Sequence, residues 1–100
     1  MGFDYSRANH RWRRLRDRVL REQRWCQEAK RYGELKPAEI VHHVWPVEDY
    51  PEYAYCRWNL IALTAANHGK MHDRDTRKLT ALGEYWRRRT HPPPPLTPTA

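Results

Sequence analysis

Four of the six histidines in the chain lie in two short motifs. His42 and His43 are adjacent in VHHVWP, and His68 and His72 are four residues apart in NHGKMH. Histidines four apart on a helix share a face and can bind one metal ion; without a metal they are an exposed pair. Adjacent residues on a strand leave opposite faces, so we expect one histidine of the first motif to be a ligand and the other to point at a substrate.

The chemistry that such a set could perform is hydrolysis of a phosphodiester. Three imidazoles could hold one divalent ion with open positions, and the ion would take a phosphate oxygen and stabilise its charge. The fourth imidazole, with an ordinary pKa of about 6.5, could remove a proton from water near neutral pH. A nearby cation would disfavour its protonation and keep the base ready.

The charge balance favours a polyanionic partner. The chain has 19 Lys and Arg against 12 Asp and Glu, a net charge of +7 and a pI near 9.8. Nucleic acid is the partner that such a balance indicates, and a merely soluble basic surface is the alternative. The candidate DNA-binding side chains lie on a predicted helix and beside the histidines: Arg14, Arg18, Arg21, Arg57, Lys70 and Arg74. Lys70 faces away from both helical histidines, and the helical arginines could equally form a solvated face.

The composition excludes several classes of protein. The hydrophobic share is 39 % and the mean hydropathy is −1.09, and no apolar run approaches the ~20 residues of a membrane span. The first residues, MGFDYSRANHRWRR, have no apolar region of a secretory signal. We therefore expect a cytoplasmic protein with no membrane contact, in which Cys26 and Cys56 are reduced thiols.

The pattern of apolar residues predicts one small domain over residues 9–90. An arm covers residues 1–8, and a Pro-rich extended tail covers residues 91–100. Residues 9–25 are expected to form a helix that buries Trp12, Leu15 and Val19 and is capped by Ser6 or Asn9. A connector containing Gly33 and Pro37 follows it.

The histidines fall on the predicted elements of the second half. A short strand is expected within residues 38–46, a loop over 47–58 and a second strand over 59–63. Thr64 would cap a helix from Ala65 to about His72. A last helix is expected to start near Asp75 and to bury Leu79, Leu82 and Trp86 at i, i+3, i+7 spacing.

Taken together, VHHVWP, NLIAL and NHGKMH resemble the HNH endonucleases, whose core is the ββα-metal (His-Me finger) motif. The paired histidines and the HxxxH close are most similar to colicin-type DNases, and the upstream residues are similar to phage HNH proteins often encoded near DNA-packaging genes. The resemblance implies an α+β fold with a core at about residues 38–73, flanked by an N-terminal and a C-terminal helix. It implies that His43 is the general base, that Asn59 holds the loop and the His43 ring, and that His42, His68 and His72 are the metal ligands.

One departure from the family pattern concerns a structural zinc site that many HNH proteins build from two CxxC pairs. Cys26 matches the first position, but Ala29, Thr64 and Asn67 stand at the other three. One cysteine cannot build that site, so we expect no structural zinc knuckle. Cys26 should instead be a buried small hydrophobe, and packing by Trp12, Trp25, Trp58 and Trp86 should replace the zinc.

The resemblance thus predicts a metal-dependent DNA endonuclease of low sequence specificity that nicks or cuts both strands. The cofactor would be one divalent ion; nitrogen ligands favour Zn²⁺ or Ni²⁺, and family behaviour adds Mg²⁺ and Mn²⁺. Glu48, Asp49 and Glu52 could add oxygen ligands or form a solvated acidic patch. The alternatives are a non-catalytic nucleic-acid-binding module and a packaging accessory that binds a terminase subunit.

Overall fold

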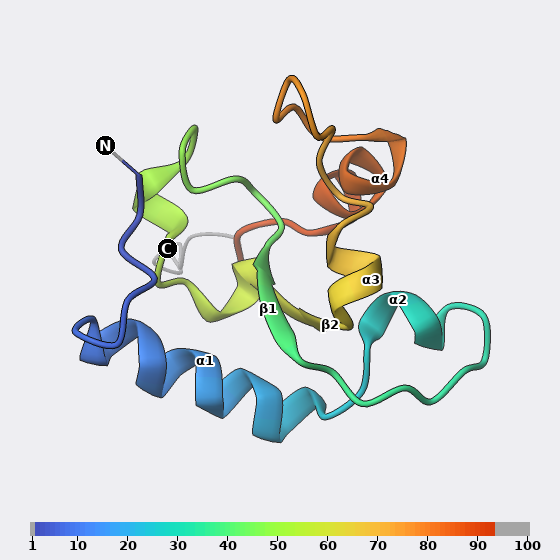
Figure 1. Cartoon of the computed structure of the whole chain (residues 1–100), viewed down its shortest axis with the longest axis horizontal. Coiled ribbons are helices and arrows are strands. Elements are labelled where there is room, and N and C mark those ends of the chain that lie inside the picture. Colours follow the sequence, from blue (N-terminus) through green and yellow to red (C-terminus); the bar gives the residue numbers. More distant parts are fainter. Residues whose placement is uncertain (1, 94–100) are drawn as a thin grey trace, which may run out of the picture.

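A computed structural model describes residues 2–93, and it confirms the predicted α+β class. Figure 1 shows a two-stranded sheet with helices on both faces. The elements in chain order are α1 (His10–Gln23), α2 (Gln27–Lys30), β1 (Ile40–His43), β2 (Leu60–Leu63), α3 (Ala65–His68) and α4 (Ala81–Arg89), with short 3-10 turns at Pro51–Tyr53 and Arg57–Asn59. From residue 94 onward, the predicted tail lies outside the described residues. Within the described range, no helix has the length and apolar character to cross a membrane.

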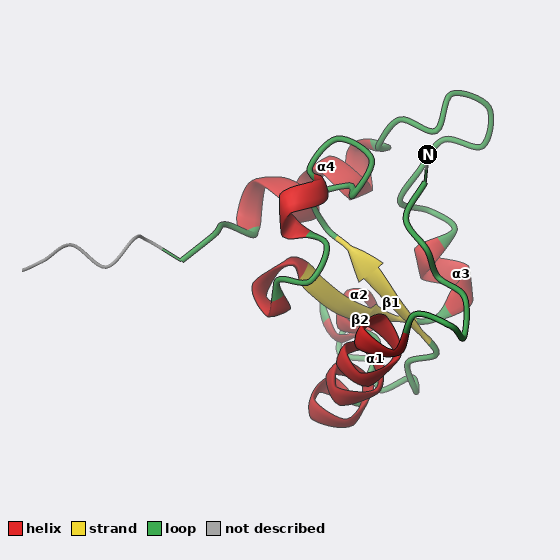
Figure 2. Ribbon diagram, turned by 90° about the vertical axis from the view of Figure 1, so that its left-hand side faces the viewer, coloured by secondary structure: helices red, strands yellow, loops and turns green. Residues whose placement is uncertain are grey.

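The sheet separates two small cores. Strands β1 and β2 pair antiparallel, with Ile40 opposite Leu63 and His43 opposite Leu60. On one face, Leu60 and Ala62 pack with Trp12 of α1, while on the other face Ile61 and Leu63 pack with residues from α2 and from the segment before α4. Side chains alternate along a strand, so neighbouring residues of β1 enter different cores. Figure 2 shows α1 below the sheet and α4 on its far side.

Helix α1 forms as predicted. The Asn9 side chain accepts a hydrogen bond from the Trp12 backbone N–H and so caps its first turn. Trp12 and Val19 are buried against the sheet. At its end, Gln23 caps the outer edge of β2, because its side chain donates to the Leu60 carbonyl and accepts from the Ala62 N–H. This contact leaves the outer edge of β1 as the open edge of the sheet.

The long connection between the strands is held by Asn59, which is fully buried. Its Oδ1 accepts from the Trp45 N–H at 2.7 Å, and its Nδ2 donates to the carbonyls of Trp45 at 3.1 Å and Tyr53 at 3.3 Å. One amide thereby ties both ends of the loop to the base of the sheet. Aromatic contacts also hold the loop, including Trp45 against Tyr50 and Tyr53.

The prediction of a helix reaching His72 was wrong. Helix α3 ends at His68, with Gly69 as its C-cap, and the chain then turns. Met71 is completely buried, and its carbonyl accepts from the Thr80 N–H. His72 then forms an isolated bridge with Leu79. Burying Met71 in the small core outweighs continuing a helix that Gly69 already weakens.

The predicted start of the last helix near Asp75 was also wrong. Asp73 Oδ1 accepts from the N–H groups of Asp75 and Thr76, which closes a tight turn, and the hairpin continues to residue 79. Helix α4 begins only after Thr80, whose hydroxyl accepts from the Gly83 N–H. At Gly83 a Cβ would collide with the Met71 carbonyl, so glycine allows α4 to approach the core.

The four positions of the family zinc knuckle are held by hydrogen bonds and packing. Cys26 is buried, as predicted; its thiol receives a hydrogen bond from Asn67 Nδ2 at 3.2 Å and lies 3.8 Å from Thr64 Oγ1. Ala29 packs in the same core. Both Cys26 and Cys56 are free thiols. Helix α2, which carries Ala29, was missed because it has only four residues.

The aromatic replacement for zinc differs in part from the prediction. Trp12 belongs to the core against α1, and Trp86 packs against the core on the other face, together with Trp45. Trp25 and Trp58 are half-buried and belong to neither core. Trp86 also donates from its indole N–H to the buried carboxylate of Glu28 at 2.9 Å. That carboxylate pairs with Arg31 at 2.7 Å, so a polar contact fastens α4 to α2.

Candidate active site

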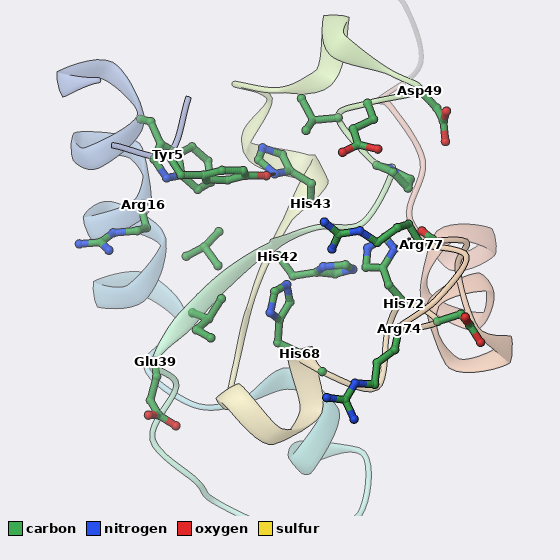
Figure 3. Close-up of a pocket in the computed structure, with 18 residues that line it drawn as sticks. Tyr5, Arg16, Glu39, His42, His43, Asp49, His68, His72, Arg74 and Arg77 are labelled. Atoms are coloured by element: carbon green, nitrogen blue, oxygen red, sulfur yellow. Dashed lines mark hydrogen bonds between the residues drawn. The ribbon is translucent and has the colours of Figure 1, made fainter. Parts of the chain in front are cut away.

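A groove of about 810 Å³ runs along the open edge of β1 (Figure 3). All four residues of β1 line it. One wall comes from the N-terminal arm and α1, and the other comes from the segment between α3 and α4. Histidines 42, 43, 68 and 72 all line this groove, so the structure brings the residues of both sequence motifs to one place.

Three of these histidines form a cluster on the α3 side of the sheet. The ring of His42 lies 5.3 Å from the ring of His68 and 5.7 Å from that of His72, centroid to centroid, and meets both edge to face. His42 is 2 % exposed. Burial, followed by the neighbouring rings of His68 and His72, lowers the pKa of His42 well below its ordinary value. Burial and then His72 lower the pKa of His68. The rings of His42 and His68 are therefore neutral at pH 7 and can donate lone pairs.

The cluster has two features that fit a bound cation. His42 Nε2 is a buried polar atom with no hydrogen-bond partner within residues 2–93, which is costly unless something satisfies it. His72 Nδ1 lies 3.1 Å from the Arg77 carbonyl, and because a carbonyl only accepts, Nδ1 carries the hydrogen and Nε2 is left free. This is the outer contact by which proteins commonly orient a metal-binding imidazole.

The donor atoms of the cluster do not yet converge. Among the described residues, no three His, Cys, Asp or Glu side chains stand with their donor atoms at metal-binding separations. The rings of His42, His68 and His72 are neighbours, but they meet edge to face. The residues present suit a divalent ion by donor type and by the unsatisfied Nε2, and coordination would require the rings to turn from these orientations.

His43 lies on the opposite side of the sheet, against α1. Its ring stacks on Trp12 with centroids 4.8 Å apart and planes at 21°. Its Nε2 lies 2.9 Å from the Ala54 carbonyl and its Nδ1 lies 3.1 Å from the Tyr5 hydroxyl. Burial lowers the pKa of His43, although the bond to Ala54 opposes that effect. The loop that Asn59 fastens is the one that supplies the Ala54 carbonyl.

Arginines occupy both walls of the groove, but only one of them was predicted. Arg74 lines it, together with Arg16 from α1 and Arg77 from the hairpin after α3. The other candidates stand elsewhere and do not line the groove: Arg14, Arg18, Arg21, Arg57 and Lys70. Arg18 and Arg57 both pair with Glu22, at 3.3 Å and 3.1 Å. Glu48 and Asp49 line the groove, whereas Glu52 does not.

Several groups at the site carry no signal in the sequence. The Ala54 and Arg77 carbonyls act through the backbone, which any residue type would provide. Tyr5 lies 38 residues before its partner His43. Arg77 has a positive φ of 65°, unusual for a residue with a side chain, and such positions often accompany a functional constraint. Only the excess of arginine hinted at Arg16 and Arg77.

Comparison with solved structures gives an independent view of this arrangement. The chain is similar to the crystal structure of the HNH endonuclease of the deep-sea thermophilic bacteriophage GVE2 with manganese ion. The TM-score is 0.58 at 27 % identity, over 62 % of this chain and 68 % of the phage chain. This likeness supports the assignment of the chain to the HNH endonuclease family. No family model and no curated protein matches it.

The two-stranded sheet and the helix that follows it match the ββα-metal fold of the HNH endonucleases. In this chain the first strand carries both histidines of VHHVWP, and α3 carries the first histidine of NHGKMH. The second, His72, lies beyond the helix. The cluster therefore combines His42 from a strand, His68 from a helix and His72 from the hairpin after that helix.

Proposed function

We propose that this HNH protein is a metal-dependent DNA endonuclease that hydrolyses phosphodiester bonds. The observation that carries the proposal is the meeting of the His42, His68 and His72 rings in the same groove that His43 lines. His42 and His43 lie on opposite faces of β1, next to the two buried cores. Similarity to a phage HNH endonuclease supports the same reaction class.

His43 is the general base in this proposal. The Ala54 carbonyl can only accept, so the neutral ring carries its hydrogen on Nε2 and keeps a lone pair on Nδ1. Nδ1 takes a proton from a water molecule, the water oxygen bonds to phosphorus, and one P–O bond to sugar breaks with its electron pair. Because burial lowers the pKa of His43, the base is neutral at pH 7.

His42, His68 and His72 would hold the divalent ion. When bound, such an ion stabilises the negative charge that develops on the phosphate oxygens. Nitrogen donors favour Zn²⁺ or Ni²⁺, while Glu48 and Asp49 in the same groove offer oxygen donors that suit Mn²⁺ or Mg²⁺. Manganese in the crystal of the phage relative supports a divalent ion of this kind.

DNA would lie in the groove with its phosphates between Arg16 on one wall and Arg74 and Arg77 on the other. Contacts to phosphates position a duplex but carry no sequence information, so low sequence specificity is expected. The net charge of +7 would attract DNA from a distance. A phage origin, as for the relative, would place the reaction in the host cytoplasm during DNA packaging, with a terminase subunit as a partner.

A plasmid assay tests this proposal. Supercoiled DNA is incubated with the full chain and Mn²⁺, Mg²⁺, Ni²⁺ or Zn²⁺, and nicked and linear products are measured. We expect cleavage by the native protein, a loss of about 100-fold or more in His43→Ala, and no loss in the control His10→Ala, which is exposed on α1. Equal rates for the native protein and His43→Ala would remove His43 from the reaction. DNA binding without cleavage in the presence of any of these metals would support the alternative, a non-catalytic nucleic-acid-binding module.

A further inference from the structure

The proposed base is already engaged on both ring nitrogens. His43 Nε2 lies 2.9 Å from the Ala54 carbonyl, and Nδ1 lies 3.1 Å from the Tyr5 hydroxyl. Figure 3 shows Tyr5 reaching from the N-terminal arm to His43 at the wall of the groove. A base must offer a lone pair to water, so these two contacts decide whether it can act.

The direction of both bonds follows from the atoms involved. A carbonyl can only accept, so Nε2 donates to Ala54 and Nδ1 carries the lone pair. Nδ1 must then accept, and the Tyr5 hydroxyl must donate. Burial, followed by the charge of Glu48, raises the pKa of Tyr5, which keeps the phenol protonated as a donor. The lone pair needed for proton transfer is thus occupied by the phenol.

The arm that carries Tyr5 is anchored by the residues that come just before Tyr5 in the chain. Phe3 packs edge to face against Trp12 and His43, with ring centroids 5.3 Å away in both cases. Asn9 Nδ2 donates to the Asp4 carbonyl at 2.8 Å. Tyr5 itself is 57 % exposed. Its ring can therefore leave His43 by breaking one hydrogen bond and its ring contacts with Phe3, Trp12 and His43, while the contacts of Phe3 with Trp12 and His43 keep the arm in place.

We infer that Tyr5 is a positioning residue that controls the Nδ1 lone pair of His43. In the free protein the phenol holds the ring in its Nε2–H form and covers the proton-accepting atom. Tyr5 lines the groove proposed for DNA, so a bound strand displaces the phenol and exposes Nδ1 to water. This inference rests on the proposed role of His43 as the base, and it assigns the arm a part in the reaction cycle.

The test uses Tyr5→Phe, which removes the hydroxyl and keeps the ring. Diethyl pyrocarbonate acylates unprotonated imidazole nitrogens, and tandem mass spectrometry of peptides gives the rate at His43 without any need for cleavage. Loss of one neutral hydrogen bond should raise that rate by about 2- to 12-fold. The rate at exposed His10 is the internal reference. Tyr32→Phe, which changes a tyrosine that is 69 % exposed and does not line the groove, is the matched control.

Cleavage kinetics on the same variants give the second readout. Because bound DNA displaces the phenol, Tyr5→Phe should lower KM by a similar factor with kcat unchanged. An unchanged or slower modification of His43 would overturn the inference. So would a fall in kcat with faster modification, because the phenol would then take part in proton transfer. A native protein that cuts no DNA would remove the proposed function, yet the modification rates would still decide whether Tyr5 covers Nδ1.

Discussion

Replacing Asn59 by alanine should remove much of the stability of the protein. The amide makes three buried hydrogen bonds, to the N–H and carbonyl of Trp45 and to the carbonyl of Tyr53. The Tyr53 carbonyl keeps another donor, the Cys56 N–H, but both Trp45 groups lose the only partner they have among the described residues. At about 1–3 kcal/mol for each of these two polar groups left without a partner, the loss is about 2–6 kcal/mol.

That loss is large for a domain of this size, since 100 residues carry roughly 5–15 kcal/mol of total stability. Urea titration followed by tryptophan fluorescence would measure it, and the melting temperature should fall by at least about 8 °C. The loop should also release the Ala54 carbonyl from His43, so cleavage should fall even where the variant remains folded. A loss of less than about 1 kcal/mol would refute the view that Asn59 fastens the loop.

Asn59→Asp is the matched variant, because it keeps the shape and the acceptor for the Trp45 N–H. It turns the donating nitrogen into a carboxylate oxygen that faces the carbonyls of Trp45 and Tyr53. Burial against these carbonyls should raise the pKa of the new carboxyl in the folded state. The loss in free energy of unfolding of Asn59→Asp relative to the native protein should therefore become smaller as pH falls, since the protonated acid can donate again. A loss that does not depend on pH would contradict the assigned bond directions.

Further predictions concern the histidine cluster and the groove. His42→Leu should raise the melting temperature of metal-free protein, since it removes the unpartnered Nε2. The native protein should melt at a higher temperature when Zn²⁺ or Mn²⁺ is added, and His42→Leu should abolish that increase. A retained metal effect would exclude His42 as a ligand. Burial lowers the pKa of His42, His43 and His68, so the unfolded chain binds protons more readily below about pH 6.5. Metal-free stability should fall from pH 7.5 to 5.5, and by less in His42→Leu; a flat melting profile would contradict this. Arg77→Gly should keep the positive φ and leave the melting temperature equal or higher, and it should lower the slope of log K against log salt for DNA binding by about 1. Arg16→Ala should also weaken DNA binding. Unchanged affinity in both variants would place the DNA outside this groove.

The strongest predictions from the sequence were those that depend on local pattern. The span of α1 and its Asn9 cap follow from apolar spacing and a capping residue, and both are found. The two strands follow from short β-branched and apolar runs. Adjacent histidines on a strand were expected to face different ways. The contacts agree, because His42 meets His68 of α3 while His43 stacks on Trp12 of α1.

The errors arose where tertiary contacts overrode local preference. Spacing alone cannot show that Met71 is buried at the end of α3, and that burial takes His72 off the helix. It also cannot show that Asp73 closes a turn where a helix was expected. At the site, backbone carbonyls and the distant Tyr5 have no signature in a motif. The histidine pattern located the groove, and three-dimensional packing supplied the atoms that orient its rings.

The alternation of side chains along β1 makes the chemistry depend on strand register. A slip of β1 by a single residue against β2 would turn every side chain to the other face. His43 would then point at α3 and His42 at Trp12. The proposed base and the proposed ligand would exchange surroundings, while β1 and β2 stayed paired. A one-residue deletion within residues 40–43 should thus be far more damaging than one at an exposed position of the loop, such as Asp49, where the chain can absorb the change.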